Sequence, residues 1–129
     1  MQRITVVVQN RPGLLAEITE LLAAKRLSIS SIVADSVGAQ GVLHLGVEHV
    51  DEALAALAAA GYDAACEDVL LARIEDRPGA LAQLSRRLME AQLDIRGLNM
   101  VRRDEGWAVV AIATSDNARA RDVLAGQTL

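Results

Sequence analysis

The sequence has very few aromatic residues. It contains one Trp, one Tyr and no Phe, yet 52% of its 129 residues are hydrophobic, so the core must be aliphatic. The formal net charge is -4. A nucleic-acid-binding protein would need a basic surface and, for single strands, aromatic side chains on which bases stack. The composition therefore argues against nucleic acid as a partner.

Cysteine and long apolar runs are also scarce. A lone Cys66 excludes an intramolecular disulfide and fits a reducing compartment, and its place in a predicted strand favours a buried structural residue over a nucleophile. No apolar run approaches the ~18 residues that span a membrane. The N-terminus lacks the longer apolar segment of a signal peptide. We therefore expect a cytoplasmic protein with no membrane partner.

Catalytic and metal-binding patterns are missing as well. His44 and His49 are five positions apart, which places them on opposite faces of a regular strand, so they do not form a converging metal pair. No nucleophile–base pair and no paired acids stand out. The sequence therefore predicts a protein that is not an enzyme and has no cofactor or metal.

One segment occurs twice. Asn-Arg-Pro-Gly-Leu-Leu-Ala at residues 10–16 recurs as Asp-Arg-Pro-Gly-Ala-Leu-Ala at residues 76–82, an offset of 66 positions. Continued without a gap, this register pairs Leu57 with Val123 and Gly41 with Trp107. Two copies are too few for a solenoid, which needs at least about three. The repeat predicts two domains, at residues 1–68 and 69–129.

The two copies differ in charge. Residues 1–68 carry four basic against nine acidic residues, whereas residues 69–129 carry nine Arg against eight acidic residues. The net charges are therefore -5 and +1. The two copies therefore need not carry equivalent binding sites.

Hydrophobic periodicity predicts the order β-α-β-β-α-β in the first copy. Strands are expected at about 4–8, 27–37, 42–47 and 62–68, and helices from Pro12 to about 26 and at 51–60. This order is the ferredoxin-like α+β pattern, with antiparallel sheets and helices on one face. The second copy repeats it but lacks the last strand. A second subunit is the simplest cover for the open sheet edge, so we expect a homodimer or higher oligomer.

The loop between the first strand and first helix of each copy is the candidate site. A helix N-terminus attracts anions, and Gly13 and Gly79 allow close backbone approach. Asn10 or Asp76 offers an oxygen to an ammonium group, so the loop suits a free amino acid. The alternative is purely structural, because Asn and Asp cap helices and Pro-Gly makes turns. Spacing alone favours this alternative.

A strand that ends in Asn/Asp-x-Pro-Gly, followed by Leu/Ala-Leu-Ala and a helix, resembles the ACT domain. That family takes its name from aspartokinase, chorismate mutase and a prephenate dehydrogenase. The likeness covers both copies and is closest at residues 74–98. The resemblance implies domains that pair side by side and bind amino acids or other small metabolites at the pair interface.

The resemblance also implies which residues contact the ligand. They are the loop residues Asn10, Arg11, Gly13, Leu14 and Leu15 in the first copy, and Asp76, Arg77, Gly79, Ala80 and Leu81 in the second. From the facing strands come Ser31, Ile32, Asn99 and Met100. The implied function is a stand-alone, bacterial, amino-acid-sensing protein that allosterically regulates a partner enzyme or pathway. An assembly module without its own ligand is the alternative.

Overall fold

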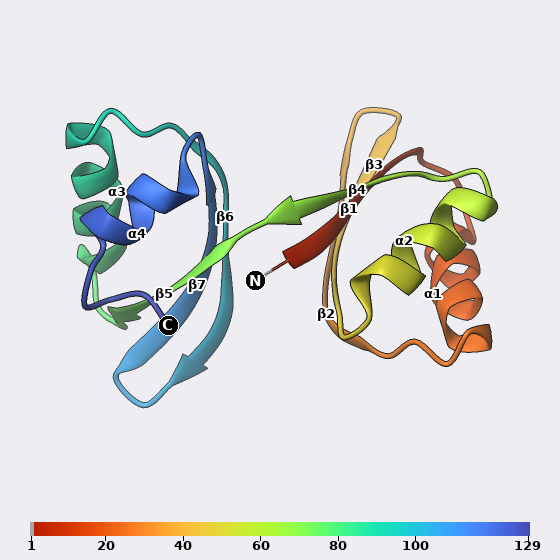
Figure 1. Ribbon diagram of the computed structural model, residues 1–129, viewed down its shortest axis with the longest axis horizontal. Helices are drawn as coiled ribbons and strands as arrows, with labels where there is room; N and C mark the ends of the chain where they lie inside the picture. The colour runs from red at the N-terminus through yellow and green to blue at the C-terminus, as the bar shows by residue number, and fades with distance from the viewer. Residues whose placement is uncertain (1) are drawn as a thin grey trace. The chain divides into compact units, whose positions relative to one another are not determined.

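The computed structural model describes residues 2–129, which form two compact units, Gln2–Glu67 and Asp68–Leu129 (Figure 1). Each unit has helices packed on one face of an antiparallel sheet, so the predicted α+β fold is confirmed. Each unit is described by itself below.

The first unit follows the predicted element order. Its elements are β1 (Gln2–Gln9), α1 (Leu14–Ala24), β2 (Ile29–Val37), β3 (Gln40–Val47), α2 (Val50–Ala59) and β4 (Asp63–Asp68). The described strands pair in the order β2-β3-β1-β4. In the antiparallel register Gln40 of β3 pairs with Gln9 of β1 on one side and with Val37 of β2 on the other. The end of β1 therefore meets the β2–β3 turn, and this places the candidate loop beside the hairpin.

The core of the first unit lies between the helices and one sheet face. Alternate residues of β1 and β3 point into it, as the two-residue period of a strand requires. On α1 the inward residues follow helical spacing, so one stripe of the helix packs on the sheet. The fully buried members include Ile4, Val6, Ile18, Leu22, Leu45, Ala53 and Leu57.

Helix α1 begins two residues later than the sequence suggests. Pro12 precedes the helix, and Gly13 is the N-cap with φ of 84°. This left-handed conformation is costly for residues with a Cβ. The backbone conformation therefore explains the glycine better than the need for a ligand to approach the backbone does. Gly79 adopts the same conformation before α3, with φ of 92°.

The second unit contains β5 (Leu70–Glu75), α3 (Ala80–Glu90), β6 (Ile95–Asp104), β7 (Trp107–Thr114) and α4 (Asn117–Val123). Within residues 68–129 the sheet has three strands in the order β5-β7-β6, so the predicted lack of a fourth strand is confirmed. The outer edge of β5 is partly occupied, however. Leu129 N donates to Leu71 O, and Arg73 N donates to Gln127 O.

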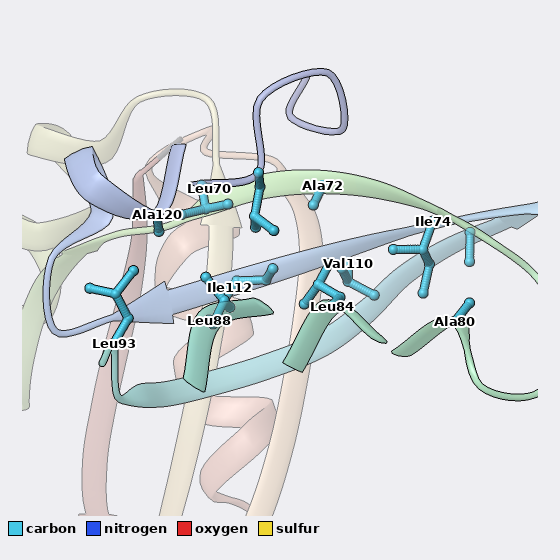
Figure 2. Close-up of a cluster of buried hydrophobic side chains, with 12 residues drawn as sticks. Leu70, Ala72, Ile74, Ala80, Leu84, Leu88, Leu93, Val110, Ile112 and Ala120 are labelled. Atoms are coloured by element: carbon cyan, nitrogen blue, oxygen red, sulfur yellow. The ribbon is translucent and has the colours of Figure 1, made fainter. Parts of the chain in front are cut away.

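The core of the second unit is built from the corresponding positions (Figure 2). Leu84 and Leu88 of α3 lie over Val110 and Ile112 of β7, and all four are at most 1% exposed. No aromatic side chain belongs to this cluster. The aliphatic core predicted from composition is therefore present.

The gap-free repeat register is wrong after Met100 of β6. In β6 the pairing with β7 shifts between Met100 and Arg102, which leaves Val101 as one extra residue in a β-bulge. From that point the structural offset is 67. Thus Leu57 corresponds to Leu124, and both are fully buried.

The same shift changes the partner of Trp107. Because Val8 pairs with Gly41 and Ile74 pairs with Ala108, Gly41 corresponds to Ala108, and Trp107 corresponds to Gln40.

The expectation that Cys66 is buried is also wrong, since it is exposed on β4. No helix among residues 2–129 is long and apolar enough to cross a membrane.

A polar network lies on the sheet face of the first unit that the helices do not cover. Thr5 Oγ1 donates to Glu67 Oε2 at 3.0 Å and contacts His44 Nδ1 at 3.0 Å, and Arg3 Nε donates to the same carboxylate oxygen at 3.1 Å. Since the single Thr5 proton goes to Glu67, His44 Nδ1 must be the donor to Thr5.

Two pKa values are lowered in this network. Burial lowers the pKa of His44, the Arg3 charge lowers it further, and the Glu67 carboxylate opposes both. Burial raises the pKa of Glu67, but the hydrogen bonds from Arg3 and Thr5 outweigh it and the net pKa is lowered. Both groups therefore contribute stability that is lost on acidification.

We expect the first unit to lose stability in two steps as the pH falls. The unfolded chain protonates His44 near its ordinary pKa of 6.5, before the folded chain does, so the free energy of unfolding falls as pH drops through that value. The Glu67 contribution disappears below 4.5, as its lowered folded pKa is passed. Urea denaturation of His44→Gln should lack the first step. His49→Gln, outside the network, should retain it; equal pH profiles for both variants would contradict the assignment.

Candidate functional site

A pocket of about 550 Å³ lies where α1 of the first unit begins, next to the end of the β2–β3 hairpin. The loop after β1, the first turn of α1, and residues 34–36 and 41 of the hairpin contribute to it. Its lining comprises Asn10, Arg11, Gly13, Leu14, Leu15, Ala16, Ala34, Asp35, Ser36, Gly41 and Leu43. The five loop residues predicted from the sequence therefore all line one pocket.

The start of α1 gives the pocket an anion-binding wall. Gly13 caps the helix without a side-chain hydrogen bond, so no side chain covers the first turn from that position. The first N–H groups of any α-helix have no intrahelical acceptors, and the helix dipole adds positive potential there. In this loop Leu14 N donates to Arg11 O at 3.3 Å. A carboxylate is the natural ligand for such a wall.

Asn10 provides a side-chain oxygen, an acceptor for a cationic group, beside the N-terminus of α1. Its backbone N–H donates to Ala39 O at 2.7 Å, which fixes the loop against the hairpin turn. A Cβ built on Gly41 would lie 3.8 Å from Asn10 Oδ1 and 3.8 Å from Leu14 Cδ2. Because Gly41 has no side chain, the pocket reaches its backbone, and Asn10 Oδ1 lies nearby.

The hairpin adds one further polar group on this side. Ser36 pairs with Gly41 and shares its face of the sheet, whereas Asp35 pairs with Val42 on the other face. Asp35 Oδ1 accepts a hydrogen bond from Ser36 N at 2.8 Å. Ser36 thus joins Asn10 as a polar residue of the lining, while the side chain of Asp35 belongs to the opposite face of the sheet.

Arg11 is paired beside the pocket. Its guanidinium donates to Glu17 of α1, and Tyr62 Oη donates to the other Glu17 oxygen at 2.7 Å. These hydrogen bonds, from Tyr62 and then Arg11, hold the pKa of Glu17 below its ordinary value. Because Glu17 stays ionised and neutralises Arg11, the positive character of the pocket comes mainly from the backbone of α1.

The corresponding loop of the second unit is arranged differently. Asp76 N donates to Gly106 O at 2.9 Å, as Asn10 does to Ala39. The Asp76 carboxylate, however, lies 3.7 Å from Arg103 Nε, and Ala108 has a methyl group where the first unit has Gly41. An ion pair and an added methyl therefore occupy the place that is open in the first unit.

The remaining predicted residues lie outside the first pocket. Ser31 and Ile32 are on β2, but Ala34–Ser36 are the β2 residues that line the pocket. Asn99 and Met100 are on β6, opposite Ala111 and Val110. Their role on the facing strand of another domain stays a prediction, as does the role of Asp76, Arg77, Gly79, Ala80 and Leu81.

Sequence reasoning missed residues 34–36 and Gly41. The available signal was the two-residue turn at Gly38-Ala39, which sets the last residues of β2 opposite the first of β3. Among residues 2–129, no group of three or more His, Cys, Asp or Glu side chains is placed to hold a metal ion.

Comparisons with known proteins agree with this geometry. The sequence profile of the ACT domain matches residues 2–61. The first unit is thus an ACT domain, and the repeated motif together with the fold of the second unit is consistent with a tandem ACT protein. No curated protein sequence matches.

Solved structures share the fold over nearly the whole chain. A crystal structure of a Bacteroides thetaiotaomicron protein matches with a TM-score of 0.85 at 24% identity, covering 99% of this chain and 90% of the other. The ligand-free regulatory subunit of aspartate kinase from Thermus thermophilus matches with a TM-score of 0.68 at 18% identity, covering 95% and 87%. The corresponding subunit from Thermus flavus gives 0.70 at 19%, with the same coverage.

Proposed function

We propose that this chain is a non-catalytic regulatory protein whose first unit binds a free amino acid. One observation carries the proposal: a single pocket joins the N-terminus of α1 to the side-chain oxygen of Asn10. The first suits an α-carboxylate and the second an α-ammonium group. Leu14 and Leu43 also line the pocket and offer apolar contacts to an aliphatic part of the ligand.

The amino acid would regulate by binding one of two states of the protein more tightly than the other. A ligand shifts an equilibrium only as far as its affinities for the two states differ. The structural likeness to regulatory subunits of aspartate kinase supports a partner enzyme as the regulated component. Side-by-side pairing with another copy, with β2 as an exposed edge strand, would complete the site in the way the ACT resemblance implies.

A thermal-shift screen with the twenty amino acids tests this proposal. A ligand that binds only the folded chain stabilises it by about 2.7 kcal/mol at a hundredfold excess over its dissociation constant. For domains of this size each kcal/mol raises the melting temperature by roughly 4–8 °C. We expect a clear rise with one amino acid or a small group of them. No rise with any amino acid up to millimolar concentration would contradict the proposal.

The alternative, an assembly module without a ligand, rests on the exposed length of β2. Ile32, Val33 and Val37 are 41%, 39% and 76% exposed on this edge strand. Such a module would associate equally well with and without amino acids. Sedimentation velocity with and without the ligand from the screen separates the two functions.

A further inference from the structure

We propose that the second unit has a separate binding site for a small dianion, in a pocket of about 410 Å³. The pocket lies between β5, the start of β7, one side of α3 and the segment that follows α4. Six of its lining residues carry the polar chemistry: Arg73, Arg77, Gln83, Arg87, Trp107 and Gln127. None of them lines the pocket of the first unit, and Arg77 is the one that the ACT resemblance also implies as a ligand contact.

The lining has an excess of positive charge. It contains three arginines and one carboxylate, Glu75, which pairs with Arg77. Among residues 2–129, no carboxylate lies within 4 Å of the guanidinium nitrogens of Arg73 or Arg87. Arg73 lies on the sheet face that carries Trp107, and Arg87 lies on α3, so a ligand with two negative charges would neutralise both by binding across the edge of β5.

Neutral acceptors position Arg87 and help to position Arg77, which also pairs with Glu75. Arg87 donates to Gln127 Oε1 and to Val123 O, and Arg77 Nη2 donates to Gln83 Oε1 at 3.0 Å. Amide groups hold a guanidinium in place without cancelling its charge, and each guanidinium has five N–H donors in all. The planar fork of arginine suits the oxygens of phosphates and carboxylates. A phosphate group and a compact dicarboxylate share this chemistry.

The first copy does not require these charges to fold. At the corresponding positions it has Val7 for Arg73, Glu17 for Gln83 and Leu21 for Arg87. There, Arg11 is neutralised by Glu17. The fold therefore tolerates an uncharged version of this region, and the unneutralised arginines are specific to the second unit.

Trp107 gives this site its own optical signal. It is the sole Trp of the chain, it lines the pocket, and the Arg73 guanidinium carbon lies 4.3 Å from its ring centroid. An anion bound to Arg73 changes the charge directly over the indole ring. Binding is expected to alter Trp107 emission, and residues 2–67 of the first unit contain no tryptophan of their own.

The test is a fluorescence titration of the full chain with inorganic phosphate or succinate, using acetate and chloride at matched ionic strength as controls. We expect saturable changes with phosphate or succinate, with a dissociation constant of about 1 mM or lower, and none with acetate or chloride. A response to phosphate alone identifies a phosphate site, and one to succinate alone a dicarboxylate site. Equal responses to all four anions, or none at all, would overturn the proposal.

Matched arginine variants distinguish specific binding in the pocket from nonspecific electrostatic attraction of anions to the surface. Arg87→Gln should weaken binding tenfold or more, whereas Arg86→Gln, which removes the same charge from the neighbouring position outside the pocket, should change it less than about twofold. Equal losses would overturn the proposal. If Arg87→Gln does not fold by circular dichroism, Arg73→Val, which copies the first unit, replaces it with the same expectation. An amino-acid response in the thermal-shift screen is independent of all these outcomes.

Discussion

Leu22→Ala is expected to destabilise the first unit by about 2–5 kcal/mol, the usual cost of truncating a fully buried leucine. Leu22 is 0% exposed and packs among Ile18, Leu45 and Leu57 under the sheet. A unit of this length has a total stability of only about 3–10 kcal/mol, so the variant should be close to unfolded. Urea denaturation followed by far-ultraviolet circular dichroism measures the change.

Leu15→Ala is the matched control. It removes the same atoms from the same helix, but Leu15 is 47% exposed, so little packing is lost. We expect a loss below about 1 kcal/mol. Comparable losses for the two variants would show that the assigned core face of α1 is wrong.

Gly41→Val is expected to abolish the stabilisation by amino acids while the chain stays folded. The new Cβ would lie 3.3 Å from Val8 Cγ2 and 3.8 Å from Asn10 Oδ1, and the two methyl groups would extend into the pocket. Overpacking of this kind costs about 1–3 kcal/mol, partly offset because glycine is unfavourable within a strand. The thermal-shift assay reports both quantities, the melting temperature without ligand and the shift with ligand.

Gly38→Asn is the control for Gly41→Val. Gly38 lies in the β2–β3 turn with φ of 60°, no atom lies within 4 Å of an added Cβ, and Asn tolerates this conformation. It should keep the full ligand response. A Gly41→Val protein that responds like the parent chain would place the amino acid elsewhere.

Much of the fold was predictable from the sequence because its elements carry strong periodic patterns. The leucines of α1 and the β-branched run of β1 each specify one buried face, and the repeat supplied the second unit. The offset of 67 after Val101 was not predictable. A β-bulge adds one residue without a distinctive composition, so only the observed pairing of β6 with β7 reveals it.

The candidate site was predictable only in part. The Pro-Gly loop before α1 has a recognisable motif, whereas Ser36 and Gly41 enter the pocket through strand register. The asymmetry between the units depends on the distance between Asp76 and Arg103, which are 27 positions apart in sequence. Either Arg102 or Arg103 could have reached Asp76 from the sequence alone, and the extra residue in β6 puts Arg103 at the position of Ser36.

Amide chemical-shift mapping by NMR tests the central claim most directly, with the amino acid that gives the largest thermal shift. We expect the largest changes at the N–H groups of Gly13, Leu14 and Leu15, and smaller changes at residues 34–36. The loop at residues 76–80, where Asp76 pairs with Arg103, should change less. Saturating shifts confined to residues outside the pocket of the first unit would contradict the claim that this pocket binds the amino acid.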